Sequence, residues 1–369
     1  MTHEPIVFAA VEGGGTSFAL LIAEFNPNTS LSSPSPDHES NMIPETLFRV
    51  IAHTTISSQT PTQTLAEAAD FFKLHQPSCG YAALGVASFG PVGLNSKDKQ
   101  SYGKILPGSP KKEWRSVDIL TPFLHACSKD PSIPLPHLMD TDVNAPAMAE
   151  FQVYHDKDTT LSSLAYVTVG TGVGVGLIMN SLPVHGMMHP EGGHVPIAPL
   201  LNHDPFQGYS WGKDKGPFGG NNTVEGMASS VALTERWALT QSLESKDHSA
   251  EQRNILVDLS DDDSIWDHAA NALASLCVTL ILLNSVEKIV LGGGVMKRSV
   301  LFDKIRSRTR ILLNGYLDLP QVTTDEGLKN LIVPSIWSSL LKSHGVTAGL
   351  VGALTLAQKA YEKSIGQIE

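Results

Sequence analysis

Short runs of apolar residues that end in glycines mark the start of the chain. "IVFAAV" (6–11) has the composition of a buried strand, and a second apolar run, "FALLIAEF" (18–25), follows the glycines at once. We therefore predict a hairpin with its turn around residues 12–17. The pattern further predicts a third strand at 46–56, an amphipathic helix at 62–75 and a strand that runs into glycine at 81–90.

A similar set begins near residue 164. "LAYVTVGTGVGVGLIM" (164–179) predicts a strand, a glycine turn and a second strand. The order of three strands, helix and strand in the first half differs from the strict βαβ alternation of a dinucleotide-binding fold. We therefore predict two related α/β halves with a cleft between them. Later elements are a long apolar helix at 265–286, a strand with a glycine loop at 287–296 and a terminal helix at 345–363.

Composition narrows the class of protein. The chain has 369 residues, 41% of them hydrophobic, which is enough for two domains. Its formal net charge of -11 and the lack of a basic run argue against nucleic-acid and membrane partners. The longest apolar stretch (272–283) is too short to span a bilayer, and the N-terminus does not resemble a signal peptide. We expect a cytoplasmic protein.

Two further composition features are less informative. The cysteines, Cys79, Cys127 and Cys277, lie far apart in the sequence and are expected to be buried free thiols. Residues 26–45 are rich in Ser, Pro and Asn and predict an excursion between two strands, whose role stays open.

Three glycine-rich turns are candidate nucleotide contacts. "EGGGTS" (12–17) and "GTGVGVG" (170–176) lie between paired strands, and "GGGV" (292–295) follows another strand. Glycines permit close approach of a phosphate, which successive N–H groups and a threonine hydroxyl hold. None is a P-loop, because no Gly-Lys-Ser/Thr follows. Each turn alone is equally typical of a hairpin that binds nothing.

The stretch "HPEGGHVPI" (189–197) places His189, Glu191 and His194 within six residues. Such a cluster fits a metal site, a catalytic pair, a pair that binds sugar hydroxyls, or an ordinary loop. A carboxylate with a neutral imidazole supplies both acceptors and a donor, as a polyol requires. Spacing alone does not choose among these interpretations.

Taken in order, these segments resemble the ROK-family sugar kinases, and most closely the fructokinases of that family. The resemblance extends over nearly the whole chain, and it implies an actin-like (ribonuclease H-like) ATPase fold of two α/β domains with a central cleft. Residues 1–140 with 347–369 would form the N-terminal domain, and residues 141–346 the C-terminal domain. The segments that carry it are "VEGGGT" (11–16), "VASFGPVGLN" (86–95), "YGKILPGSPKKEWRSVDI" (102–119), "DTDVNAPAMAEF" (140–151), "HPEGGHVPI" (189–197) and "VEGMAS" (224–229).

The resemblance implies an ATP-dependent fructokinase, a homodimer that transfers the γ-phosphate to the 6-hydroxyl of D-fructose. Asp142 would be the general base, because the Asp-x-Asn pattern of the family fits 142–144 better than it fits the competing carboxylate, Asp140. Asp142 and Asn144 are also good caps for the helix that follows. Alternatives are a mannose or broad-specificity hexokinase, a non-catalytic sugar-binding regulator and a non-kinase actin-like ATPase.

The remaining site residues are also carried over from the resemblance. ATP would bring Mg²⁺, bound mainly by phosphates and waters, and Glu12 is a candidate to hold one of those waters. Many relatives have lysine after the threonine of the first turn, where this chain has Ser17. The expected sugar contacts are Glu191, His194 and Glu225, with Asn95 and Asn144 as weaker candidates, and the expected nucleotide contacts are Gly13, Gly14, Gly15, Thr16, Thr171, Gly172, Gly174, Gly292, Gly293 and Gly294.

Many members of the family hold a structural zinc ion with one histidine and several cysteines after the Gly-His pair. Between His194 and Glu225 this chain has no cysteine, although His203, Asp204 and Asp214 are alternative ligands. Without zinc, the loop 199–223 would depend on packing of its aromatic side chains. These are Phe206, Tyr209, Trp211 and Phe218.

We predict that the purified protein carries no stoichiometric zinc, because structural zinc sites depend on thiolate ligands that this loop lacks. Elemental analysis of the dialysed protein is the measurement. A result of about one zinc per chain would contradict the prediction, since a structural site of this kind holds a single ion.

Overall fold

Two five-stranded sheets with the same strand arrangement form the framework of the protein. The computed structural model describes residues 4–27, 42–43, 45–130, 132–209, 217–241, 255–337 and 346–368. The chain divides into two compact units. The first comprises Met1–Thr159, His185–His189 and Ser339–Glu369, and the second comprises Thr160–Val184 and Pro190–Ser338.

The first sheet is built from a hairpin, a third antiparallel strand and two parallel strands. Its order is β3-β2-β1-β4-β5, in which β1 is antiparallel to β2 and parallel to β4. The predicted order of three strands, helix and strand is confirmed, and the hairpin turn is closed by a 2.9 Å hydrogen bond from Gly14 N–H to the Ser17 carbonyl. The strands are β1 (Ile6–Gly13), β2 (Ser17–Phe25), β3 (Phe48–Ser57), β4 (Ala83–Ser88) and β5 (His137–Thr141).

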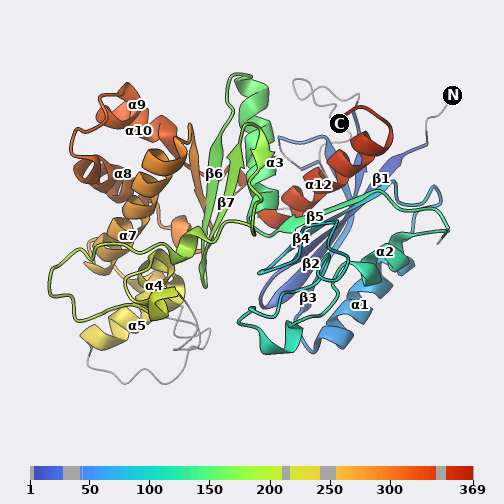
Figure 1. Cartoon of the computed structure of the whole chain (residues 1–369), viewed down its shortest axis with the longest axis horizontal. Coiled ribbons are helices and arrows are strands. Elements are labelled where there is room, and N and C mark those ends of the chain that lie inside the picture. The colour runs from blue at the N-terminus through green and yellow to red at the C-terminus, as the bar shows by residue number, and fades with distance from the viewer. Residues whose placement is uncertain are drawn as a thin grey trace. The chain divides into compact units, whose positions relative to one another are not determined.

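Helices cover both faces of this first sheet, with α12 and α3 on one face and α1 and α2 on the other (Figure 1). The first of them starts where the sequence predicts, because the Thr60 hydroxyl accepts the Gln63 N–H and Pro61 occupies the first turn. The helices are α1 (Pro61–Leu74), α2 (Thr121–Cys127), α3 (Asn144–Lys157) and α12 (Ala348–Ser364), with a 3₁₀ turn η2 (Lys112–Trp114).

The second sheet repeats the arrangement of the first. Its order is β10-β9-β6-β7-β8, with β6 antiparallel to β7 and parallel to β9, so that β6 to β10 correspond in order and direction to β1 to β5. The prediction of two related α/β halves is thereby confirmed. The strands are β6 (Leu164–Val169), β7 (Val173–Met179), β8 (Leu182–Pro183), β9 (Ile289–Gly292) and β10 (Ile332–Pro334).

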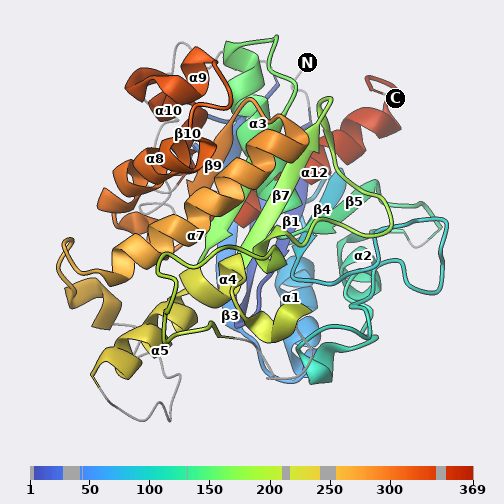
Figure 2. The same ribbon diagram turned by 60° about the vertical axis from the view of Figure 1, so that its left-hand side comes forward.

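The long apolar helix of the second unit is α7 (Ile265–Thr279), which continues as a π-helical turn, η5 (Leu280–Asn284). By length and composition 265–284 would cross a bilayer, but 72% of its most apolar window is buried. Its composition is accounted for by packing in the core, where it lies beside α8 (Figures 1 and 2). The other helices are α4 (Val224–Ala228), α5 (Ser230–Thr240), α8 (Val300–Leu313), α9 (Pro320–Thr323) and α10 (Asp325–Leu331), with 3₁₀ turns η3 (Gly192–His194), η4 (Pro217–Gly220) and η6 (Val295–Lys297).

The boundary of the first unit differs from the one expected after residue 140. The unit extends to Thr159, because α3 packs on α12. It also includes His185–His189, a short segment that returns to the first sheet between two stretches of the second unit. We call this segment the histidine strap.

The three cysteines are free, as expected, but only two of them are buried. Burial raises the pKa of the Cys127 and Cys277 thiols, which keeps both in the neutral, unreactive form. Cys79 is half-buried.

A buried ion pair attaches the loop around Asp204 to the second unit. Both carboxylate oxygens of Asp204 accept hydrogen bonds from Arg236 of α5, at 3.0 and 2.8 Å. Nδ1 of His268, from α7, lies 3.2 Å from the same carboxylate. Burial alone would raise the pKa of Asp204, but the bonds from Arg236 and from Phe206 N–H outweigh it and lower that pKa. Asp204, one of the alternative zinc ligands, is thus a member of an ion pair.

The aromatic residues of the loop divide into packed and exposed ones. The ring of Phe206 is buried and lies 4.7 Å from the Arg236 guanidinium carbon, and Tyr209 packs against the core. Phe218 is 62% exposed, so its expected packing role is wrong. Trp211 and Asp214 lie outside the described residues, as does most of the 26–45 excursion.

We expect Arg236→Met to lower the free energy of unfolding by about 3–5 kcal/mol, because it leaves the Asp204 carboxylate buried without its partner. The folded-state pKa of Asp204 is depressed, so the pair stabilises the fold above the ordinary aspartate range and loses this effect as pH falls through the folded pKa. Urea unfolding at neutral and acid pH would show a difference between wild type and variant that shrinks in acid.

The control is Lys73→Met, which removes an exposed pair with Asp70 (3.1 Å) and should leave stability unchanged. Equal, small losses in the two variants would contradict a stabilising role for the buried pair.

Candidate functional site

The turn from β5 into α3 carries both candidate catalytic carboxylates of the first unit. Asp140 is 2% exposed, and its Oδ1 accepts hydrogen bonds from Thr141 N–H (2.7 Å) and from the Asn144 side-chain amide (3.0 Å). Its Oδ2 lies 3.0 Å from Nε2 of His185 in the histidine strap. This hydrogen bond raises the pKa of His185, which favours the imidazolium. Asp140 is therefore fully engaged within the fold.

Asp142 occupies a different environment two residues later. It is half-buried, and its backbone N–H is held by the Ser88 carbonyl at the end of β4 (2.8 Å). The capping bond at the start of α3 is made by the Thr141 hydroxyl, which accepts the Asn144 N–H at 2.9 Å. Of the two carboxylates, Asp142 is the more exposed.

Asn144 is completely buried, with its amide bonded to Asp140. This position supports the turn and does not support the direct sugar contact expected for Asn144. Asn95 is exposed in the loop after β4, where its side-chain oxygen accepts the Lys97 N–H at 3.0 Å. That side chain forms a local turn and remains open to solvent.

The second histidine of the strap attaches to the same loop. His189 is 7% exposed, and its Nε2 lies 3.4 Å from Val92 N, which donates to it. His189 and His185 together hold the strap on the first unit. Both histidines have a structural role in this geometry. Of the three residues of "HPEGGHVPI" that could carry chemistry, only Glu191 and His194 lie in the second unit.

The first glycine turn is tied to the C-terminal helix through Glu12. The Thr347 hydroxyl, which caps α12, donates to the Glu12 carboxylate, and a Cβ on Gly349 would come within 2.2 Å of it. A larger residue at position 349 would therefore displace the Glu12 side chain. Burial raises the pKa of Glu12, against the effect of the Thr347 bond. Gly15 and Thr16, at the tip of the turn, are exposed.

In the second unit three predicted sugar ligands lie together. Glu225, at the start of α4, accepts the Val173 N–H at 2.9 Å. Burial raises the pKa of Glu225 and the negative charge of Glu191 adds to this, while the Val173 bond and His194 act in the opposite direction. His194 Nε2 lies 3.8 Å from Glu191 Oε2. The carboxylates of Glu191 and Glu225 and the imidazole of His194 thus influence one another electrostatically.

The pair of glycines in "HPEGGHVPI" is explained by contact with the second hairpin. Gly193 lies directly on β7, where a Cβ would come within 1.9 Å of the Val173 carbonyl oxygen. This contact places His194 and Glu191 next to the turn that carries Thr171 and Gly172. Because Glu225 already binds Val173 N–H, one amide of that turn is not available to a phosphate.

The other predicted nucleotide residues lie at turns that end strands. Gly170 N–H donates to the Gly172 carbonyl at 2.9 Å and closes the second hairpin turn. Gly292 is buried at the end of β9, and Gly294 is exposed with open space around it. Among the residues that the structure describes, no group of three or more His, Cys, Asp or Glu side chains is placed to hold a metal ion.

Two residues near the site were not predicted. Lys111 lies in the segment 102–119, and His185 lies between the second hairpin and "HPEGGHVPI", but nothing in their spacing indicates a partner. Lys111 comes close to the first glycine turn, since a Cβ on Gly15 would lie 3.0 Å from its Nζ. His185 reaches Asp140 across 45 residues of chain.

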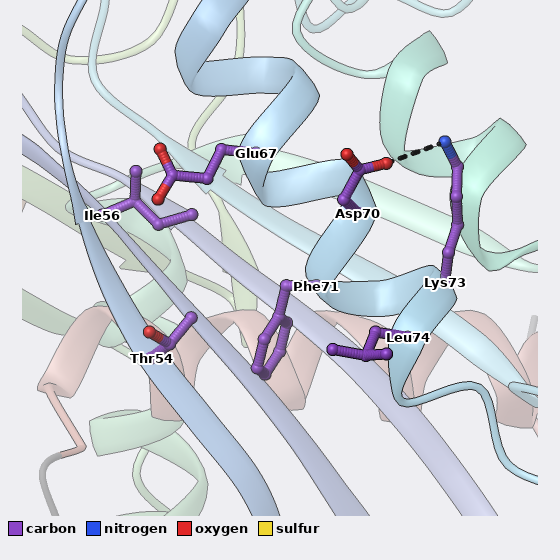
Figure 3. A pocket seen from close by; sticks show the side chains of 7 residues that line it. All are labelled: Thr54, Ile56, Glu67, Asp70, Phe71, Lys73 and Leu74. Atoms are coloured by element: carbon purple, nitrogen blue, oxygen red, sulfur yellow. Dashed lines mark hydrogen bonds and ion pairs between the residues drawn. The ribbon is translucent and has the colours of Figure 1, made fainter.

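A surface groove elsewhere in the first unit contains none of these residues. It lies between α1 and β3 (Figure 3), and two of its charged groups, Asp70 and Lys73, bind one another at 3.1 Å. Its third charged group is the Glu67 carboxylate, and its apolar wall includes Phe71 and the largely exposed Leu74.

Comparison with known proteins agrees with the motifs. The chain is 31% identical to the fructokinase of Zymomonas mobilis subsp. mobilis over 98% of this chain and 100% of that protein. It is 32% identical to a putative fructokinase of Bacillus subtilis, over 82% of this chain and 86% of that protein. Its fold matches a ROK family glucokinase from Streptomyces griseus in complex with glucose and AMPPNP (TM-score 0.60, 18% identity, 96% and 100% covered). The ROK family model matches residues 9–360, and the chain therefore belongs to the ROK family.

Proposed function

We propose that the protein is an ATP-dependent fructokinase that forms fructose 6-phosphate, with Asp142 as the general base. The observation that carries the proposal is the unequal placement of the two carboxylates, with Asp140 buried and bonded and Asp142 accessible at the start of α3. Relatives named fructokinase at about 30% identity over nearly the full length support the choice of sugar.

The units have different tasks in this proposal. The sugar hydroxyls are bound in the second unit by Glu191, His194 and Glu225. The carboxylates and the imidazole supply the hydrogen-bond acceptors and donors that a polyol requires. A sugar that lacks one of these hydroxyls would leave a polar group of the site without its partner and would bind less well. The turns of both units bind the nucleotide through backbone amides.

The reaction is an in-line transfer between oxygens. The oxygen of the sugar 6-hydroxyl attacks the γ-phosphorus of ATP, and its proton passes to the Asp142 carboxylate. The bond between the γ-phosphorus and the β–γ bridging oxygen breaks, and ADP leaves with that electron pair. Because the transition state is largely a charge redistribution, positioning and electrostatic stabilisation account for most of the rate.

Mg²⁺ bound to the nucleotide would neutralise phosphate charge. The donor set fits an ion that is held mainly by phosphates and waters, since Glu12 is the one acidic side chain of the first turn. Its carboxylate, already oriented by Thr347, would accept a hydrogen bond from a coordinated water.

We expect turnover with fructose in a coupled ADP-release assay on a panel of hexoses. Asp142→Asn should lower kcat by about 100- to 10,000-fold, the range for loss of a general base. The matched control is Asp156→Asn near the end of α3, an exposed residue that accepts a hydrogen bond from the Gln152 side chain at 2.8 Å and should leave kcat unchanged.

The outcomes separate the alternatives. Full turnover in Asp142→Asn would overturn the mechanism, and faster turnover of mannose than of fructose would reassign the sugar. Calorimetric binding of a sugar without turnover of any sugar would replace the kinase by a sugar-binding regulator.

A further inference from the structure

The first glycine turn has no positive charge of its own. Its residues Gly13–Ser17 carry only glycines and two hydroxyl side chains. The γ-phosphate of ATP carries the charge that develops during transfer, and neutral amides alone stabilise it less than a cation does. A basic side chain beside this turn would therefore have to come from another segment of the chain.

Lys111 is the side chain that reaches this turn. Its Nζ lies where a Cβ on Gly15 would be 3.0 Å away, and it stands 4.8 Å from the centroid of the Phe89 ring. Phe89 follows β4, whose last residue, Ser88, holds the backbone of Asp142. The ammonium group thus lies by the glycine turn, on the side of the strand end that carries the general base.

The segment that carries Lys111 is held rigidly against the hairpin. Trp114, three residues on, is 3% exposed and stacks on Phe18 of β2 with ring centroids 5.2 Å apart. The same indole meets Phe89 edge to face at 5.6 Å. Because Phe18 directly follows the glycine turn, this aromatic contact fixes the distance between that turn and Lys111.

The charge of Lys111 is also set by its surroundings. Burial lowers the pKa of Lys111, and the negative charges of Asp142 and then Glu113 act against this. A partly desolvated ammonium interacts more strongly with a phosphate than a hydrated one does. Its neighbour Lys112 is exposed and has no such environment.

We propose that Lys111 is a catalytic residue that binds the γ-phosphate of ATP at the Gly15 turn and stabilises it during transfer to the hydroxyl activated by Asp142. The proposal rests on the proposed function, since it assumes ATP at this turn. If Lys111 served only to pack against Phe89, its replacement would affect the binding of different nucleotides equally.

The first experiment measures binding in the absence of sugar. Isothermal titration of wild type, Lys111→Met and Lys112→Met with ADP and with the non-hydrolysable analogue AMPPNP isolates the effect of the γ-phosphate. In Lys111→Met we expect the ratio of the two affinities to shift against AMPPNP by about tenfold, because one charge-assisted contact is lost. Lys112→Met should retain the wild-type ratio.

The second experiment measures kinetics with the best sugar. Lys111→Met should lower kcat/KM for ATP by about 100-fold, as does loss of one donor to developing charge, while KM for the sugar is unchanged. Lys111→Arg should retain most activity and move the alkaline fall of kcat/KM to higher pH. The sign follows because lysine acts when protonated, its pKa is lowered here, and arginine stays protonated.

The results test the role of Lys111 and the proposed function separately. An unchanged affinity ratio in Lys111→Met, or a change confined to the sugar KM, overturns the assignment of Lys111. If Lys111→Met does not fold, an alkaline fall at the same pH in wild type and Lys111→Arg overturns it as well. If wild type phosphorylates no sugar, the proposed function fails, and the affinity ratio still supports or overturns the contact between Lys111 and the γ-phosphate.

Discussion

The buried carboxylate of Asp140 is the contact on which the geometry of the first unit's site depends. Three donors from different places converge on it: a backbone amide, the Asn144 side chain and His185 of the histidine strap. A buried carboxylate with fewer partners would be strongly unfavourable, so these groups are held together. These contacts fix the turn between β5 and α3, and they thereby fix the direction of Asp142.

In the second unit the main constraint is burial of the Glu225 carboxylate, which raises its pKa, and the negative charge of Glu191 adds to this. The hydrogen bond from Val173 N–H and the imidazole of His194 lower the pKa of Glu225 and so offset part of this effect. In the proposed function these acceptors and donors bind the hydroxyls of the sugar. The occupied Val173 amide explains why the first turn, with Lys111 beside it, is the stronger candidate for the γ-phosphate.

The loop after "HPEGGHVPI" is anchored by charged and aromatic side chains. This segment is joined to the unit by the bidentate pair of Asp204 and Arg236, with the ring of Phe206 against the guanidinium. The pair links the loop to α5, and His268 extends the link to α7. Removing either charged partner would leave the other buried without its counter-charge, which is strongly unfavourable.

The sequence by itself determined the two α/β halves, their glycine turns and the family, because strand periodicity and turn glycines are local signals and because the motifs keep their order. It also indicated Asp142, Glu191, His194 and Glu225 as residues of the chemistry. Only the tertiary structure decided that Asp140 and Asn144 are interior, that the strap joins the first unit, and that His185 and Lys111 stand beside Asp140 and Gly15. The reason is that packing brings together residues that lie far apart in the chain. The local periodicity of the sequence contains no information about such contacts.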